Sequence, residues 1–303
     1  MQTTAQLLKK ELPEVSKKLL GQIVREPKTV RSQPLISSWT ASTRHFSSTN
    51  GSRDRVLPAE DYISWDTKTP VKIHMGESAP ANQEPIRIQT MLKQTAEKYP
   101  DHLALTIKRD GVWKNWTYRQ YLDQVERVGK AFHALGLKRH QGVGIMATNS
   151  PEWYISSLAT IFAGGISSGI YLTNSPEMVS YVCDHAPMNI LVLEDLETYD
   201  QVLGGRSLKE AFPTVETIVL LNGNSDGRKE IISWSELLDL GERQDNDVLE
   251  HIAQDQGANE AAMLLYTSGT TGPPKGKPVI ALLNSKKSLT ESVSIPFRCY
   301  AEP

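Results

Sequence analysis

Between residues 86 and 276, short apolar segments alternate with longer segments in which apolar residues recur every three or four positions. The short segments lie at 143–147, 166–172, 190–193, 217–221 and 261–266. The longer ones lie at 88–99 and 118–135 and after Ser150-Pro151, Ser175-Pro176 and Ser233. Strand-like runs that alternate with helical periodicity indicate βαβ units. We therefore predict an α/β fold, with a mainly parallel sheet and helices on both faces.

This regular pattern is confined to the middle of the chain. Within it, strands at 103–108 and 112–118 flank Asp110-Gly111, which is a hairpin signal. Residues 1–55 form a Ser/Thr-rich leader with ten Lys/Arg against four Asp/Glu, which we predict to be disordered. We interpret 56–85 as a linker, 86–276 as the α/β domain and 277–303 as a tail. Residues 1–50 and much of the tail are expected to pack poorly.

The leader allows more than one interpretation. Apolar residues recur at helical spacing between Leu8 and Ile23, with lysines beside them. This pattern fits a membrane-surface helix or a mitochondrial presequence. Glu11, Glu14 and Glu26 are unusual in a presequence, which favours a solvated, partly helical leader.

Composition excludes several classes of protein. A formal net charge of -2 gives no reason to expect nucleic-acid binding. The only cysteines, Cys183 and Cys299, have no partner at metal-ligand spacing, which argues against a zinc site and a disulfide framework. No apolar run approaches the roughly 20 residues that span a bilayer. We predict a cytoplasmic protein, at most peripheral to membranes, with a mitochondrial location as the alternative.

The stretch from Tyr266 to Gly276 reads YTSGTTGPPKG. It follows the predicted strand 261–266, so it lies at the carboxyl end of that strand, where open α/β sheets bind ligands. Glycines let backbone N–H groups approach an anion, while hydroxyls and a lysine add donors and charge. These features fit a polyphosphate. The stretch is not a Walker A sequence, since an alignment on Gly276-Lys277 puts Thr271 and Pro278 at mismatched positions.

The stretch resembles the phosphate-binding signature of the adenylate-forming superfamily, which contains acyl-CoA synthetases, luciferases and peptide-synthetase adenylation domains. The similarity extends upstream over about 190 residues, where successive blocks of sequence resemble those of the superfamily. These blocks are Trp116-Thr-Tyr118, 142–153, Ala163-Gly-Gly165, 169–175, 181–186 and Asn189-Ile-Leu191. The later blocks are most similar to the bubblegum branch of long-chain acyl-CoA synthetases.

The resemblance implies a two-step ligase. ATP, with Mg²⁺, and a long-chain fatty acid give an acyl-adenylate and pyrophosphate, and coenzyme A then displaces AMP to form the thioester. Carried over residue by residue, the ATP phosphate-binding site comprises Thr267, Ser268, Gly269, Thr270, Thr271, Gly272, Pro273, Pro274 and Lys275. We assign no catalytic residue and no metal ligand, and the oligomeric state is left open.

The resemblance stops at Lys277. Relatives continue with an apolar strand and a Ser-His pair, whereas residues 277–303 contain no histidine, and the later adenine-binding and ribose-binding blocks are not found. We therefore expect the N-terminal portion of the superfamily's large domain, a partial AMP-binding domain at 86–276 with a divergent tail, and no acyl-CoA formation by the 303-residue chain alone. The alternative is a non-catalytic, truncated isoform that binds a nucleotide or a partner weakly.

Other conspicuous residues are interpreted as structural. His185, on a predicted helix, reads as a packed or capping histidine, and Trp153 as core or groove packing. Cys183 reads as a small buried hydrophobe. The acidic stretch 242–250 reads as one solvated helix face.

Overall fold

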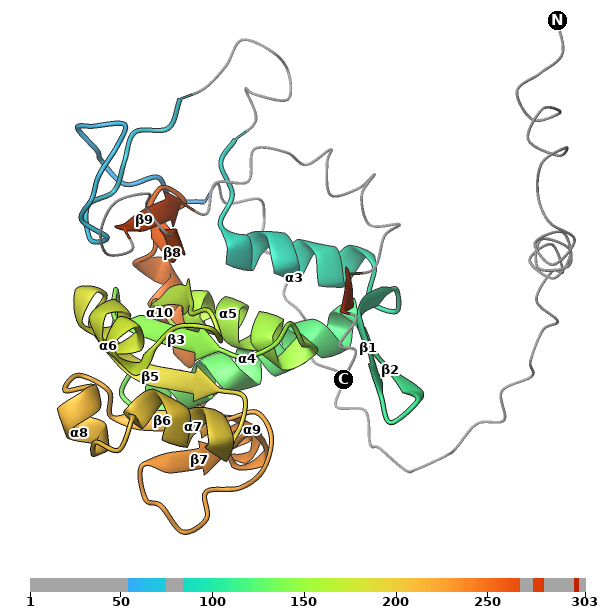
Figure 1. The fold of residues 1–303 in the computed structure, drawn as a ribbon. Coiled ribbons are helices and arrows are strands. Elements are labelled where there is room, and N and C mark those ends of the chain that lie inside the picture. The colour runs from blue at the N-terminus through green and yellow to red at the C-terminus, as the bar shows by residue number, and fades with distance from the viewer. Residues whose placement is uncertain (1–53, 75–83, 268–274, 281–296, 300–303) are drawn as a thin grey trace, which may run out of the picture. The chain divides into compact units, whose positions relative to one another are not determined.

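The computed structural model describes residues 54–74, 84–267, 275–280 and 297–299 (Figure 1). The helices are α3 (Ile88–Lys98), α4 (Tyr118–Ala134), α5 (Pro151–Phe162), α6 (Pro176–His185), α7 (Leu196–Leu203), α8 (Leu208–Ala211), α9 (Trp234–Glu242) and α10 (Val248–Gln254). The strands are β1 (Leu103–Arg109), β2 (Val112–Thr117), β3 (Gly142–Met146), β4 (Ile166–Gly169), β5 (Met188–Leu193), β6 (Thr217–Leu220), β7 (Ile231–Ser233), β8 (Ala261–Thr267), β9 (Lys275–Ile280) and β10 (Phe297–Cys299).

The main sheet has seven strands in the order β7-β6-β5-β3-β4-β8-β9. All neighbouring pairs are parallel except β8 and β9, which are antiparallel. Helices connect most of the parallel strands, as βαβ units require. The predicted α/β class, with a mainly parallel sheet and helices on both faces, is confirmed.

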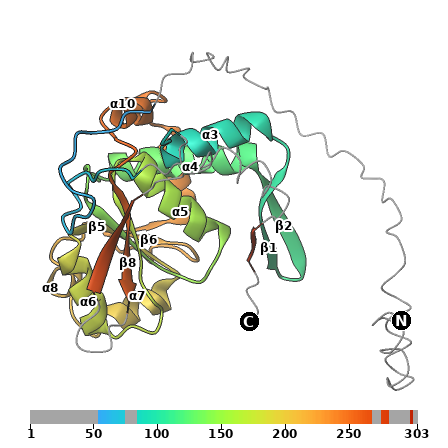
Figure 2. The ribbon, with the colours of Figure 1, turned by 90° about the horizontal axis from the view of Figure 1, so that it is seen from above.

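The inner strands of the sheet are buried on both faces. In β5, Ile190 and Val192 belong to one apolar cluster, while Leu191 and Leu193 belong to the other. The first cluster contains residues of α3, α4, α5, α9 and α10, and the second contains residues of α6, α7 and α8. Figure 2 shows α3 and α4 on one side of the sheet and α6, α7 and α8 on the other. The alternation of side chains along each strand therefore supplies two separate cores.

Side-chain caps fix where several helices begin. The Ser150 hydroxyl accepts a hydrogen bond from the backbone N–H of Trp153, and Pro151 occupies the first turn of α5. Ser175 and Pro176 begin α6 in the same way. Ser233 and Glu236 form a reciprocal capping box at α9. The predicted starts of these three helices are confirmed.

Strands β1 and β2 form the predicted hairpin. Asp110 and Gly111 connect the strands with φ values of 50° and 76°, in the left-handed region that tight hairpin turns require. Strand β10 pairs in parallel with β1 on its other side, which makes a separate three-stranded sheet. Residues 297–299 and 277–280 of the predicted tail thus contribute to two different sheets.

Residues 54–74 are attached to the turn before β8, although most of this segment falls in the predicted linker. The Asn259 side chain accepts a hydrogen bond from the Leu57 N–H (2.8 Å) and donates to the carbonyls of Leu57 and Val71 (2.9 Å each). Asn259 is 1% exposed, so its amide replaces the water that these backbone groups would otherwise bind. We call this contact the Asn259 clasp.

The prediction of one helix face across 242–250 is wrong. Helix α9 ends at Glu242 and α10 begins at Val248, with turns between them. Asp245 and Asp247 lie in this connection, where the Asp247 N–H donates to the Asp245 side chain (3.0 Å). Acidic residues that bond their own backbone favour turns over helix interiors, which explains the break.

We predict that Leu191→Ala destabilises the chain by about 2–5 kcal/mol, because it opens a cavity in the second core. Leu191 is fully buried, while Leu172 is 37% exposed, so Leu172→Ala is the matched control and should cost far less. Urea unfolding followed by circular dichroism measures both changes. Equal losses for the two variants would contradict the assignment of the core.

Candidate functional site

The neighbouring strands β4 and β8 are followed by connections that run in opposite directions. After β4 the chain passes through α6 to β5, on the far side of β3, whereas β8 leads to its other neighbour β9. In open α/β sheets a ligand crevice forms where the connections diverge in this way, at the carboxyl ends of the strands. The connections after β3 and β5 diverge in the same way, so the sheet topology allows a binding site at either pair of strands. The Gly/Ser/Thr-rich stretch after β8 favours the carboxyl ends of β4 and β8.

The predicted phosphate-binding residues begin and end at this position. Thr267 is the last residue of β8 and Lys275 is the first residue of β9, and the two are paired across the antiparallel ladder. Both ends of the Gly/Ser/Thr-rich stretch are thus brought side by side. The remaining predicted residues, Ser268, Gly269, Thr270, Thr271, Gly272, Pro273 and Pro274, lie outside the described residues.

Tyr266, the residue before Thr267, is held by a neighbour from α6. Its hydroxyl lies 2.9 Å from Nδ1 of His185, and its side chain is 6% exposed. The Tyr181 ring stacks on His185, with ring centroids 5.9 Å apart. Burial raises the pKa of the Tyr266 phenol, so the hydroxyl stays protonated. The interpretation of His185 as a packed histidine, made from sequence, does not identify Tyr266 as its partner.

A second link at the carboxyl edge joins β3, β5 and β6. The Glu194 carboxylate, after β5, accepts hydrogen bonds from the N–H and hydroxyl of Thr148 (2.7 and 2.8 Å). Its other oxygen accepts from the Asn222 side chain (2.7 Å). Both oxygens are thus engaged by protein donors, and Glu194 acts as a brace between the ends of three strands.

The hairpin is joined to this edge by a bidentate ion pair. Both Arg109 terminal nitrogens contact the Glu152 carboxylate, at 3.0 and 2.6 Å. The hydrogen bond to Glu152 is the main cause that raises the pKa of Arg109. Glu152 lies in the first turn of α5, where its negative charge is favoured by the helix dipole. This ion pair fixes the position of β1 relative to α5.

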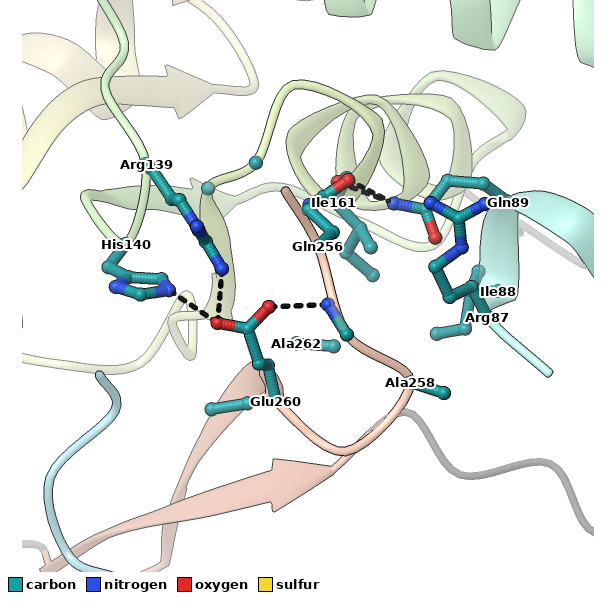
Figure 3. A pocket seen from close by; sticks show the side chains of 14 residues that line it. Arg87, Ile88, Gln89, Arg139, His140, Ile161, Gln256, Ala258, Glu260 and Ala262 are labelled. Carbon is teal, nitrogen blue, oxygen red and sulfur yellow. Dashed lines mark hydrogen bonds and ion pairs between the residues drawn. The ribbon is translucent and has the colours of Figure 1, made fainter. Parts of the chain in front are cut away.

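A polar cavity lies at the opposite, amino end of the same strands (Figure 3). Its lining comes from the segments before α3, β3, β4 and β8, with Arg87, Gln89, Arg139, His140, Gln256 and Glu260 as its polar members. The cavity volume is about 30 Å³, which is room for about two water molecules. It is too small for a nucleotide or an acyl chain, so we do not assign it to a substrate.

Glu260 is the centre of that amino-end network. Figure 3 shows Arg139 and His140 directed at one of its oxygens. The two contacts are 2.6 and 3.0 Å long, and the Gly257 N–H donates to the other oxygen at 2.7 Å. Burial raises the pKa of Glu260, but the hydrogen bonds from His140, Gly257 and Arg139 outweigh it and the net pKa is lowered. The ionised carboxylate therefore stabilises the fold.

The predictions for Cys183 and Trp153 agree with the structure. Cys183 is fully buried among apolar residues, and this burial raises the pKa of its thiol to about 12. Trp153 packs against the first core. Within the described part of the chain, no group of three or more His, Cys, Asp and Glu side chains could hold a metal ion. No helix of that part is long and apolar enough to cross a bilayer.

Glu260 should make stability depend on pH. Its folded pKa is lower than the unfolded value of 4.5, so its contribution is present above 4.5 and is lost as the pH falls through the folded value. We expect Glu260→Gln to lower the free energy of unfolding at about pH 7, and this difference to shrink below about pH 4. Urea unfolding at several pH values measures it. The exposed control Glu60→Gln should show no such trend, and a difference independent of pH would contradict the assignment.

The chain is similar to a family of enzymes and to several of its curated members. A family model described as "AMP-binding enzyme" matches residues 92–279. A Xenopus laevis long-chain-fatty-acid--CoA ligase, ACSBG2, is 35% identical over 223 residues, which are 73% of this chain and 30% of the relative. The Gallus gallus protein of the same name is 35% identical over 253 residues, or 83% of this chain and 31% of the relative. The chain thus spans about a third of the length of these curated relatives.

Solved structures support the same fold. The anthranilate CoA ligase AuaEII, crystallised with anthranoyl-AMP, aligns with a TM-score of 0.53 and 22% identity, covering 65% of this chain and 35% of its own. The A domain of a carboxylic acid reductase from Segniliparus rugosus aligns with a TM-score of 0.54 and 14% identity, covering 65% and 36%. At these identities the similarity concerns the fold alone.

Proposed function

Because the chain belongs to the family of AMP-binding enzymes, we propose that it takes part in the ATP-dependent activation of a long-chain fatty acid. In this proposal residues 267–275 hold the phosphates of ATP. The observation that carries it is the pairing of Thr267 with Lys275 at the carboxyl end of β8, beside β4. This pairing brings together the two ends of a stretch rich in N–H donors, hydroxyls and positive charge, where an α/β sheet binds ligands.

The chemistry explains why such a stretch is needed. A fatty carboxylate attacks the α-phosphorus of ATP, the bond to the β-phosphate oxygen breaks, and pyrophosphate leaves with the electron pair. Negative charge accumulates on the departing phosphates, where fixed donors and Mg²⁺ bound to the substrate neutralise it. The sulfur of coenzyme A then attacks the acyl carbon as the thiolate, its proton having gone to solvent. The acyl C–O bond to AMP breaks, AMP leaves with the electron pair, and a thioester forms. Backbone N–H groups, hydroxyls and Lys275 suit the first step, and we assign them no part in the second.

The acyl substrate and coenzyme A are supported by the relatives. Proteins named long-chain-fatty-acid--CoA ligases are 35% identical to this chain over most of its length. A long-chain fatty acid as substrate and coenzyme A as acceptor are therefore the finer part of the proposal. The cytoplasmic location, with peripheral membrane contact as an addition, stays a prediction from sequence.

The phosphate-binding role can be tested on the 303-residue chain. We expect it to bind MgATP, and Lys275→Ala to weaken that binding about tenfold or more, because a hydrogen bond to a charged group contributes roughly 1.5–3 kcal/mol. The matched control is Lys277→Ala, which removes the same charge from the same strand, two residues farther from the stretch. Calorimetric titration with MgATP measures both. Equal weakening by both variants would indicate general charge attraction and would contradict the proposal.

The fatty-acid part requires turnover. We expect a chimera, in which the aligned segment of the Xenopus laevis relative is replaced by the corresponding residues of this chain, to form palmitoyl-CoA from palmitate, MgATP and coenzyme A. Lys275→Ala in the chimera should slow ATP–pyrophosphate exchange about 100-fold or more, since one lost transition-state contact costs roughly 2.7–4 kcal/mol. A folded chimera that binds MgATP but forms no thioester would contradict fatty-acid activation and would favour a nucleotide-binding role alone.

A further inference from the structure

Beyond Leu264, the end of β8 is paired with a neighbouring strand on one side only. The register of β4 with β8 reaches Leu264, whereas the register with β9 continues to Thr267. Opposite Tyr266, the β9 partner is Gly276, which has no side chain to pack against it. Cross-strand side-chain pairs contribute to the stability of antiparallel strands, and this position has none. Tyr266 must therefore be held by contacts from outside the ladder.

Helix α6 supplies those contacts. His185, its last residue, places Nδ1 2.9 Å from the Tyr266 hydroxyl, and the two rings meet edge to face with centroids 5.7 Å apart. Tyr181, one turn earlier on the same helix, stacks on the His185 ring with an angle of 28° between the two planes. The His185 and Tyr181 side chains are both exposed, so the hydrogen bond and the two ring contacts are what orient the imidazole.

Helix α6 is itself fixed to the second core. Val179, Val182 and Cys183 are buried in the same apolar cluster as Tyr266. The Ser180 hydroxyl donates to the Ala211 carbonyl at the end of α8, at 2.6 Å. The helix therefore offers a rigid support, and His185 transmits its position to the end of β8.

We infer that His185 is a positioning residue: through the Tyr266 hydroxyl it fixes the end of β8, and with it the pairing of Thr267 with Lys275. This inference rests on the proposed function. Thr267 and Lys275 are the two ends of the stretch proposed to bind the phosphates, so their pairing affects ATP binding only if that proposal holds. We assign His185 no contact with the substrate. Its hydrogen bond orients Tyr266, which is followed in the strand by Thr267.

The test separates the hydrogen bond from general packing. Tyr266→Phe removes the hydroxyl and keeps the ring, and His185→Leu removes the imidazole. His185→Asn is the conservative variant, because an asparagine amide can place a polar atom near the position of Nδ1. The matched control is Tyr199→Phe, which removes a hydroxyl that donates to Glu230 (3.1 Å) from a tyrosine in the same core.

Two measurements on the whole 303-residue chain decide the matter. The first is amide hydrogen exchange at Tyr266, Thr267, Lys275 and Gly276. We expect it to accelerate about twofold to tenfold in Tyr266→Phe and His185→Leu, the effect of one net hydrogen bond, while β6 is unchanged. The second is the dissociation constant for MgATP, which should rise by a similar factor. His185→Asn should restore both, and the double variant should show no more effect than either single variant.

The outcomes are distinguishable. Unchanged exchange at these four amides, equal acceleration in Tyr199→Phe, or failure of His185→Asn to restore exchange would each overturn the positioning role. If the parent chain binds no MgATP, the proposed function fails, and the exchange pattern still decides whether His185 fixes the end of β8.

Discussion

Strands β3 and β5 have apolar side chains on both faces, so neither is stable in water unless helices cover both sides of the sheet. This requirement explains much of the architecture. Helices α4 and α5 cover one face of the sheet, and α6 and α7 cover the other. The connections between strands therefore lie on both faces. The position proposed for the ligand is also a matter of these connections, because open α/β sheets bind ligands where the connections leave neighbouring strands in opposite directions.

The elements that depend on local chemistry can be predicted from the sequence. Ser150-Pro151 and Asp110-Gly111 specify a helix start and a turn through groups a few residues apart, and the structure has both. The strand order and the antiparallel β9 cannot be predicted in this way. They depend on pairings between segments far apart in the chain, such as Ser168 with Leu264, and nothing in either segment alone identifies its partner.

The candidate site also has one part that depends on local sequence and one that depends on the fold. The composition of the stretch after Tyr266 fits a polyphosphate, and its resemblance to the adenylate-forming signature makes that prediction specific. The contact between His185 and Tyr266 has no comparable signal in the local sequence. The His185 side chain is exposed rather than packed in the core. The residue that it contacts lies 81 residues away, and only the fold brings the two together. The prediction for 242–250 is wrong for a different reason, since charge alone does not distinguish a helix face from a turn.

The Asn259 clasp has a consequence for the order of events during synthesis. Its hydrogen bonds join residues 202 positions apart, so the segment around Leu57 leaves the ribosome long before its partner exists. At typical rates of translation that interval is roughly 10–40 s, during which the Leu57 and Val71 backbone groups lack their Asn259 partner. The turn that carries Asn259 lies directly before β8. The residues that bind the Leu57 segment are therefore made just before the strand that joins the sheet. The beginning of the described chain therefore reaches its final place only when the strand that leads to the candidate site has been made.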